Sequence, residues 1–252
     1  MPKLSALVAV LFFATLAHAA EVVVLGAGAS KSAFTAAAQA WHEKGGHAVK
    51  ASFASAGEIR ERLAKGEKAD VLVVPRENLA EYEKAGTVDS ASRRDLGAVS
   101  IGAAVKEGAP RPDISTPEAF KHALEQAKSV TYMDPKRGTS GKYVDEVVLP
   151  KLGIRDAVRA KTQLGEGGYI AEKVARGEVE IAVHQMTELL PVKGIAILGP
   201  LPASLQKVTV YSGVIMKDAA HPAEARALLD YLASPAGQRA FIDRGFTAPP
   251  AR

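Results

Sequence analysis

The stretch DPKRGTSGKY, residues 134–143, gathers residue types that bind phosphate groups: two glycines, two hydroxyl side chains and a lysine that follows glycine. A nucleotide-binding P-loop has the pattern G-x-x-x-x-G-K-[ST], in which the final hydroxyl holds magnesium. Here Lys136 stands five positions before Gly141, where the pattern needs glycine, and Tyr143 replaces the metal-binding hydroxyl. We therefore interpret the stretch as a loop that offers hydroxyl and backbone N–H groups, and not as a nucleotide site.

Three other segments have a similar composition, and each lies just before a predicted helix: GAGASKS (26–32), FASAGE (53–58) and LGEGGY (164–169). In open α/β sheets, ligands bind at the carboxyl ends of strands, where helix N-termini point their unpaired N–H groups. A site of neutral hydroxyl and N–H groups favours an anion without a buried countercharge. Since each half of the chain supplies two of these loops, we predict that they face one another across an anion-binding cleft.

Sequence patterns for catalysis are sparse. Ser30 lies in A-S-K-S and Ser140 in T-S-G-K, so neither forms the G-x-S-x-G turn of serine hydrolases. The five histidines after residue 19 show no H-x-x-x-H or H-E-x-x-H spacing, which argues against a metal site. His184 and Gln185 lie at the end of a predicted apolar strand, where side chains contact either a ligand or solvent. We therefore predict a protein that is not an enzyme, with no catalytic residue, no metal and no cofactor.

Hydrophobic periodicity predicts the elements that must position these loops. Apolar strand-like runs at 21–30, 47–55 and 69–75 alternate with helix-like runs at 32–41 and 57–67. This order is typical of a parallel α/β sheet with helices on both faces. The later predicted elements are strands at 97–106, 129–135, 179–185 and 207–216 and helices at 117–127, 141–153, 168–178, 222–234 and 235–246.

Two α/β lobes joined by two crossing segments fit this order better than one long sheet. The extended segments near residues 99 and 212 are the predicted crossings. We predict that residues 20–99 plus 213–252 form lobe 1 and that residues 100–212 form lobe 2. Each lobe is expected to contain a mostly parallel sheet flanked by helices.

The first residues predict export. Lys3 precedes an apolar run over 4–16, and Ala17-His18-Ala19 is a small-x-small cleavage site, so residues 1–19 read as a signal peptide. The run is too short to span a bilayer as a helix. The chain has no cysteine, so it lacks both disulfides and the residue that a bacterial lipid anchor requires. We predict a soluble periplasmic protein without a lipid anchor.

The charge balance excludes one class of partner. The chain has 32 basic and 28 acidic residues, a formal charge of +4, and the two signs are interspersed. Mixed charges of this kind indicate a solvated surface, so we predict no nucleic-acid partner.

Nearly the whole chain after residue 19 resembles the solute-binding proteins of ABC importers, and most closely the periplasmic molybdate-binding family. The most specific segments are SFASAGEIRERLAKGEKADVLVVP (52–75) and ARALLDYLASPAGQRAFIDRGF (225–246). The resemblance implies a type II periplasmic binding fold whose cleft closes on a small oxyanion. It also implies a membrane permease as partner and a protein that acts as a monomer.

The resemblance also indicates which residues contact the ligand. In the second loop, the family's serine pair corresponds to Ser55 and Ala56, so one hydroxyl is missing. Gln185 stands where the family has a tyrosine. These departures suit a larger or different anion. The predicted ligand-binding residues are Ser30, Ser55, Thr139, Ser140, Gly167 and Gln185.

The predicted function is therefore capture of a small oxyanion, similar to molybdate or tungstate, for delivery to an ABC importer. Three alternatives remain open. The same fold can bind a small carboxylate, or it can present its ligand to a membrane receptor as a sensor. The third alternative is an exported serine hydrolase that uses Ser30 or Ser140 with His184.

Overall fold

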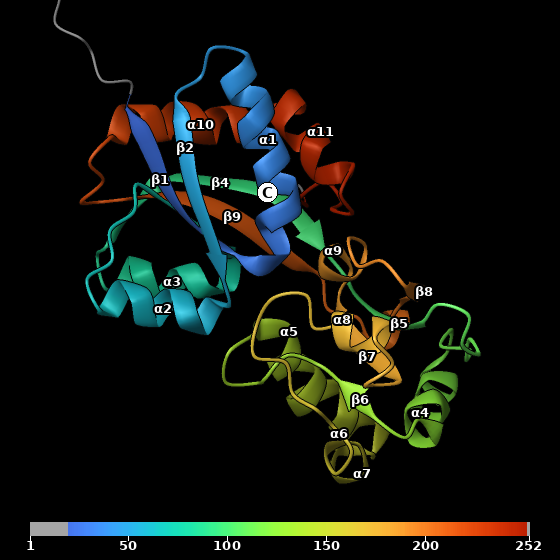
Figure 1. The fold of residues 1–252 in the computed structure, drawn as a ribbon. Helices are drawn as coiled ribbons and strands as arrows, with labels where there is room; N and C mark the ends of the chain where they lie inside the picture. The colour runs from blue at the N-terminus through green and yellow to red at the C-terminus, as the bar shows by residue number, and fades with distance from the viewer. Residues whose placement is uncertain (1–19, 251–252) are drawn as a thin grey trace, which may run out of the picture.

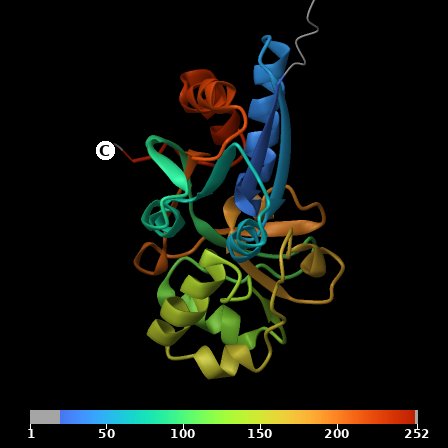
Figure 2. The same cartoon turned by 90° about the vertical axis from the view of Figure 1, so that its left-hand side faces the viewer.

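The computed structural model describes residues 20–250, so the predicted signal peptide lies outside the described residues. The chain forms two lobes, which Figure 2 shows one above the other. Each lobe is built on one β-sheet that helices flank, and the two sheets are separate. The predicted two-lobed α/β architecture is thus present. Across residues 20–250, no helix combines the length and apolar character needed to cross a membrane.

The sheet of lobe 1 has the strand order β2-β1-β3-β9-β4. Strand β1 pairs in parallel with β2 and β3, whereas β9 pairs antiparallel with β3 and β4. Helices α1, α10 and α11 pack together on one face, and α2 and α3 lie on the other (Figure 1). The strands are β1 (Glu21–Ala27), β2 (Ala48–Ala54), β3 (Val71–Pro75), β4 (Val88–Val99) and β9 (Thr209–Met216), and the helices are α1 (Lys31–Glu43), α2 (Ala56–Ala64), α3 (Arg76–Lys84), α10 (Pro222–Ala233) and α11 (Pro235–Ile242).

The sheet of lobe 2 has the order β6-β7-β5-β8. Only β6 and β7 pair in parallel among its described strands, and β5 runs antiparallel to both β7 and β8. The strands are β5 (Ile101–Lys106), β6 (Val130–Thr131), β7 (Ile181–Gln185) and β8 (Ile195–Pro200), and the helices are α4 (Pro117–Gln126), α5 (Thr139–Tyr143), α6 (Leu149–Leu152), α7 (Arg155–Arg159), α8 (Glu172–Ala175) and α9 (Met186–Leu189).

Both sheets are mixed, and not mostly parallel as predicted, because the chain passes between the lobes twice. Strand β4 ends at Val99 and β5 begins at Ile101, so one extended segment leaves the first sheet and enters the second. The chain returns through β9, which therefore runs opposite to β4. The predicted lobe boundary at residues 212 and 213 falls within β9, and the exact lobe limits stay a prediction.

The helix predicted over 141–153 is interrupted. It consists of α5, a π-helical segment η2 (Val144–Val148) and α6. Pro150 lies in the first turn of α6 and lacks the N–H group that a continuous α-helix would need there. The helix predicted over 168–178 is likewise reduced to α8. Two short 3₁₀ turns complete the described elements, η1 (Gly28–Ser30) and η3 (Ala203–Leu205).

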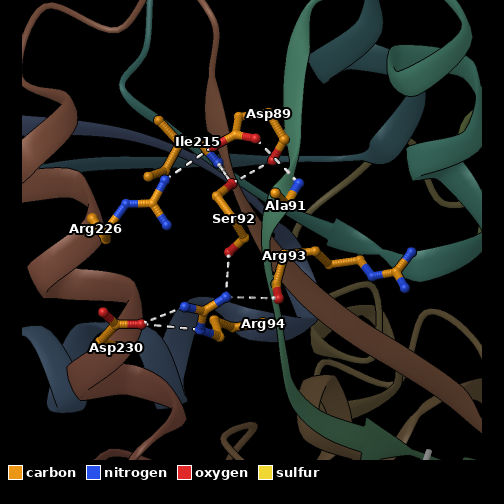
Figure 3. A network of polar contacts seen from close by, with 8 residues as sticks. All are labelled: Asp89, Ala91, Ser92, Arg93, Arg94, Ile215, Arg226 and Asp230. Carbon is orange, nitrogen blue, oxygen red and sulfur yellow. Dashed lines mark hydrogen bonds and ion pairs between the residues drawn. The ribbon is translucent and has the colours of Figure 1, made fainter.

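A polar network holds α10 against an irregular part of β4 (Figure 3). The pairing of β4 with β9 shifts register between Asp89 and Arg94. Within this bulge the hydroxyl of buried Ser92 accepts a hydrogen bond from the backbone N–H of Ile215 at 2.8 Å. Arg94 pairs with Asp230 on α10 at 2.8 Å. The Ser92 hydroxyl thus pairs with a backbone N–H of β9 at the register shift, and the Arg94–Asp230 ion pair links β4 to α10.

Candidate functional site

A cavity of about 110 Å³ lies between the two lobes, at the ends of the strands where the small-residue loops were predicted. Both lobes supply its polar lining. Lobe 1 contributes Gly28, Lys31, Ser55 and Tyr211, and lobe 2 contributes Thr139, Ser140, Tyr169, His184, Gln185 and Glu188. A larger cavity of about 710 Å³ adjoins it and shares Ala56, Gly138 and Thr139. The inner cavity therefore has room for several non-hydrogen atoms of a small ligand.

Local backbone geometry places the hydroxyls of this lining. Ser55 precedes α2, and its hydroxyl accepts a hydrogen bond from the N–H of Glu58 at 3.2 Å, which is an N-cap. Ser140 lies in α5 beside Gly141, where an added Cβ would stand 1.7 Å from the carbonyl oxygen of Met133. Only glycine permits this approach. Gly141 thus allows α5 to pack against the strand end and to bring Ser140 into the cavity.

Three polar side chains lie in line on the lobe 2 side of the cavity. His184 is the second-last residue of β7 and is 1 % exposed, while Ser140 and Glu188 are 5 % and 6 % exposed. The imidazole Nδ1 lies 3.4 Å from the Ser140 hydroxyl, and Nε2 lies 3.1 Å from the Glu188 carboxylate. The second contact is close but is not aligned as a hydrogen bond. A serine, a histidine and a carboxylate in this order can activate a hydroxyl or can accept and return a proton.

Tyr211 and Gln185 form a second buried pair that joins the lobes. The Tyr211 hydroxyl donates a hydrogen bond of 2.6 Å to Oε1 of Gln185. Burial raises the pKa of Tyr211 well above its usual value, and the charge of Glu188 raises it further, although the hydrogen bond opposes this. Tyr211 therefore stays a neutral donor. The Gln185 amide nitrogen has no hydrogen-bond partner among residues 20–250, so its N–H groups are available to a ligand.

The structure brings four of the six predicted ligand residues to the cavity wall, namely Ser55, Thr139, Ser140 and Gln185. Ser30 does not line this cavity, because its hydroxyl donates to the carbonyl of Ala27 at 2.7 Å. Gly167 is also absent from the wall, although the next residue, Gly168, lines it. Contact between these residues and a ligand stays a prediction.

Sequence reasoning missed two charged residues of the wall. Glu188 follows His184 by four positions. The two side chains meet because β7 ends and α9 begins between them, and the sequence does not show where this change occurs. Lys31 is the first residue of α1. A cation at the start of a helix is electrostatically unfavourable and could have been noticed for that reason.

This chain resembles both a protein named as an enzyme and a protein named as part of a transporter. It is 40 % identical over 194 residues to an aconitate isomerase from Pseudomonas sp., covering 77 % of this chain and 73 % of the relative. It is 25 % identical over 201 residues to a Bacillus subtilis protein named as a candidate ABC transporter substrate-binding lipoprotein, covering 79 % of this chain and 75 % of that one.

Solved structures confirm the predicted fold. The periplasmic molybdate-binding protein of Azotobacter vinelandii superposes with a TM-score of 0.77 at 18 % identity, over 91 % of this chain and all of that one. At this identity the likeness concerns the fold alone and does not extend to the ligand.

The isomerase relative contradicts the prediction that this chain is not an enzyme. That prediction relied on motifs whose residues are close in sequence. Ser140 and His184 are 44 residues apart and meet only because α5 packs beside the end of β7. Proton transfer needs only this spatial arrangement and no local motif.

The family relationship itself is clear. A family model described as bacterial extracellular solute-binding protein matches residues 22–247, which is nearly all of the described chain. Such proteins hold a small ligand, and a permease of an ABC transporter is the partner that this relationship implies. From this match and from the two-lobed fold with its interlobe cavity, we conclude that the chain belongs to the bacterial extracellular solute-binding protein family.

Proposed function

We propose that the protein isomerises aconitate, a small tricarboxylate with one carbon–carbon double bond, by moving a proton within the interlobe cavity. The observation that carries the proposal is the buried line of Ser140, His184 and Glu188 at the cavity wall. The 40 % identity with an aconitate isomerase supports the substrate.

The reaction needs only an acid–base group. In aconitate, a methylene group lies between a carboxylate and the alkene. Removal of one methylene proton leaves an electron pair that is delocalised over the three-carbon unit and its carboxylates. Return of a proton to the former alkene carbon shifts the double bond by one position. The geometry of the new double bond follows from the conformation in which the substrate is held. Atoms and electrons balance without any co-reactant.

His184 is the proposed proton carrier. The Glu188 carboxylate, 3.1 Å from Nε2, favours a proton on that nitrogen and leaves Nδ1 as the basic one. Nδ1 then accepts the substrate proton, and Glu188 stabilises the imidazolium that forms. The Ser140 hydroxyl, 3.4 Å from Nδ1, helps to orient the imidazole. The same nitrogen returns the proton to the other carbon.

The remaining polar lining is proposed to bind the carboxylates. The hydroxyls of Ser55 and Thr139 lie on opposite lobes of the cavity. Backbone N–H groups at the start of α1 are directed toward negative charge. This set supports a carboxylate ligand, one of the alternatives from the sequence, more than a molybdate-like oxyanion. The missing hydroxyl at Ala56 and the added amide of Gln185 favour the same choice.

The proposal is tested by incubating the purified protein with trans-aconitate in deuterated water and recording proton NMR spectra. We expect conversion to the cis isomer. Protium is retained at the receiving carbon where His184 returns the proton that it removed, and deuterium enters that carbon only where the carried proton first exchanges with solvent. Thermal melting with aconitate, molybdate, tungstate and sulfate is measured in parallel. Stabilisation by aconitate without conversion would show a binding protein and contradict the proposed catalysis. Stabilisation by molybdate and tungstate alone would contradict the proposed substrate.

Gly28→Ala is expected to lower kcat/KM for isomerisation about tenfold with little loss of stability. An added Cβ at Gly28 would lie 2.8 Å from Oε1 of Glu188, across the interface between the lobes. The end of a flexible side chain can move away, but it then leaves His184, and the change in stability stays below about 1 kcal/mol. Steady-state kinetics and urea unfolding measure the two effects. Gly28→Ala displaces the Glu188 carboxylate from His184, whereas Glu188→Gln removes the charge of that carboxylate. Full activity in both variants would refute the role of Glu188.

A further inference from the structure

Lys31 occupies an unusual position in the inner cavity. It is the first residue of α1, and its ammonium group lies 5.8 Å from the ring centroid of Tyr169 on the opposite lobe. Lys31 is the one lysine or arginine in the wall of this cavity. Within residues 20–250, no carboxylate forms an ion pair with it. Lys31 is exposed to solvent at the edge of the cavity, and Glu188 is the carboxylate in the same wall, so the two opposite charges face the cavity without forming an ion pair with each other.

This position opposes the electrostatics of the helix. The N-terminus of a helix carries partial positive charge, so a lysine in its first turn is repelled and an acidic residue is favoured. The first turn of α1 contains no acidic residue. A lysine at this point is slightly unfavourable for the folded protein without ligand, and an anion bound at the start of the helix would be attracted by its charge.

The other end of the same helix supplies a comparison. Lys44 follows α1 directly and lies 5.7 Å from the ring centroid of Tyr231. The two lysines thus make cation–π contacts of nearly equal length. Lys44, however, stands at the C-terminal end, where the helix favours a cation. It does not line the interlobe cavity.

A second observation also indicates that the inner cavity receives a polar ligand. Gln185 is 2 % exposed and lines the cavity, yet its amide nitrogen has no partner in the described chain. That nitrogen is not among the fully buried polar atoms without a partner, so it stays accessible from the cavity, where a carboxylate oxygen of a ligand can accept its hydrogen bond. Gln185 and Lys31 come from different lobes and line the same space.

We propose that Lys31 binds one carboxylate of the ligand and thereby makes the cavity selective for polycarboxylates over monocarboxylates. The inference rests on the proposed function. Before binding, the Tyr169 ring holds the ammonium group of Lys31 near the mouth of the cavity. When the ligand binds, the ammonium group contacts its carboxylate and either leaves the ring or stays in contact with it. A second carboxylate on the ligand meets this charge, whereas a monocarboxylate that is held elsewhere in the cavity does not reach it.

The test compares Lys31→Gln with the matched control Lys44→Gln in the full chain. Binding of trans-aconitate and of the monocarboxylate crotonate is measured by calorimetry. We expect Lys31→Gln to raise the dissociation constant for aconitate about tenfold, as loss of one charge-assisted contact predicts. Its affinity for crotonate should be unchanged. Lys31→Arg keeps the charge and should restore most of the affinity for aconitate.

Thermal melting without ligand separates this role from a structural one. Lys31→Gln should melt at the same temperature as the parent chain or higher, because it removes an unfavourable charge. Lys44→Gln should melt slightly lower and bind aconitate normally. Equal aconitate affinity for Lys31→Gln and the parent chain would overturn the inference, as would an equal loss of affinity for crotonate.

The outcomes also distinguish the inference from the proposed function. If the parent chain binds aconitate but does not isomerise it, the proposed catalysis fails, and the comparison of Lys31→Gln with Lys44→Gln still decides the role of Lys31. If the parent chain converts aconitate and Lys31→Gln leaves its affinity unchanged, the inference about Lys31 alone fails. If the parent chain binds no polycarboxylate, both fail.

Discussion

His184→Gln is expected to lower kcat/KM for aconitate isomerisation by about 10²- to 10⁴-fold, the usual contribution of a positioned general base. Glutamine keeps a polar side chain of similar length, but it cannot accept a carbon-bound proton at neutral pH. His184 is almost fully buried between Ser140 and Glu188, so water cannot readily replace it as the base. Steady-state kinetics gives the loss, and circular dichroism with thermal melting checks that the variant is folded.

His122→Gln is the matched control, because His122 is an exposed histidine on α4 of the same lobe. We expect normal activity for this variant. Activity within threefold of the parent chain for a folded His184→Gln would refute the proton-transfer role. Labelling of Ser140 by a serine-reactive phosphonate would instead favour the hydrolase alternative, which uses the same line of residues.

Asp145→Asn is expected to lower the free energy of unfolding at pH 7 by about 2 kcal/mol. Asp145 is 1 % exposed and lies in the π-helical segment of lobe 2. It accepts hydrogen bonds from Arg155 at 2.9 Å, from Nε of Arg159 at 2.6 Å and from the Tyr132 hydroxyl at 2.9 Å. Asparagine keeps the shape but removes the charge that pairs with both arginines.

The pH dependence of this effect follows from the pKa of Asp145. Burial raises that pKa, but the hydrogen bonds from Arg159, Arg155 and Tyr132 outweigh burial and lower it to about 2 from a usual 3.8. A lowered pKa in the folded state gives stability that is fully present above the unfolded value and is lost as the pH falls through the folded value. The difference between Asp145→Asn and the parent chain should therefore shrink between about pH 4 and pH 2.

Urea unfolding at several pH values measures this difference. Asp156→Asn serves as the control, because Asp156 is exposed on the neighbouring helix α7, and we expect a change below about 0.5 kcal/mol. A pH-independent difference for Asp145→Asn would mean that lost packing, and not the ion pairs with Arg155 and Arg159, causes the destabilisation.

A solute-binding fold offers clear advantages to the proposed chemistry. Its two lobes surround the ligand, which excludes water from the base and strengthens the contacts between charged groups. The proposed base, His184, lies near the end of β7 in lobe 2, while Gly28 and Lys31 come from lobe 1. The complete site thus exists only where the lobes meet. A binding cleft of this kind becomes catalytic through a few side chains, without a change of fold.

Much of this architecture was predictable from the sequence alone. Apolar runs and small-residue loops identified the first three strands, the crossing near Val99 and the loops that reach the cavity. These features depend on residues that are close together in the chain. Ser55 and Ser140 were found in this way, because a hydroxyl near a helix start has a local signature.

The tertiary structure alone decided which of those groups meet. Ser30 looked equivalent to Ser55, yet its hydroxyl turns back to its own loop at Ala27. The line from Ser140 through His184 to Glu188 depends on how α5 packs against β7, and the contact between Lys31 and Tyr169 depends on how the lobes face one another. Such distances follow from sheet pairing and lobe packing between distant segments, which periodicity along the chain does not encode.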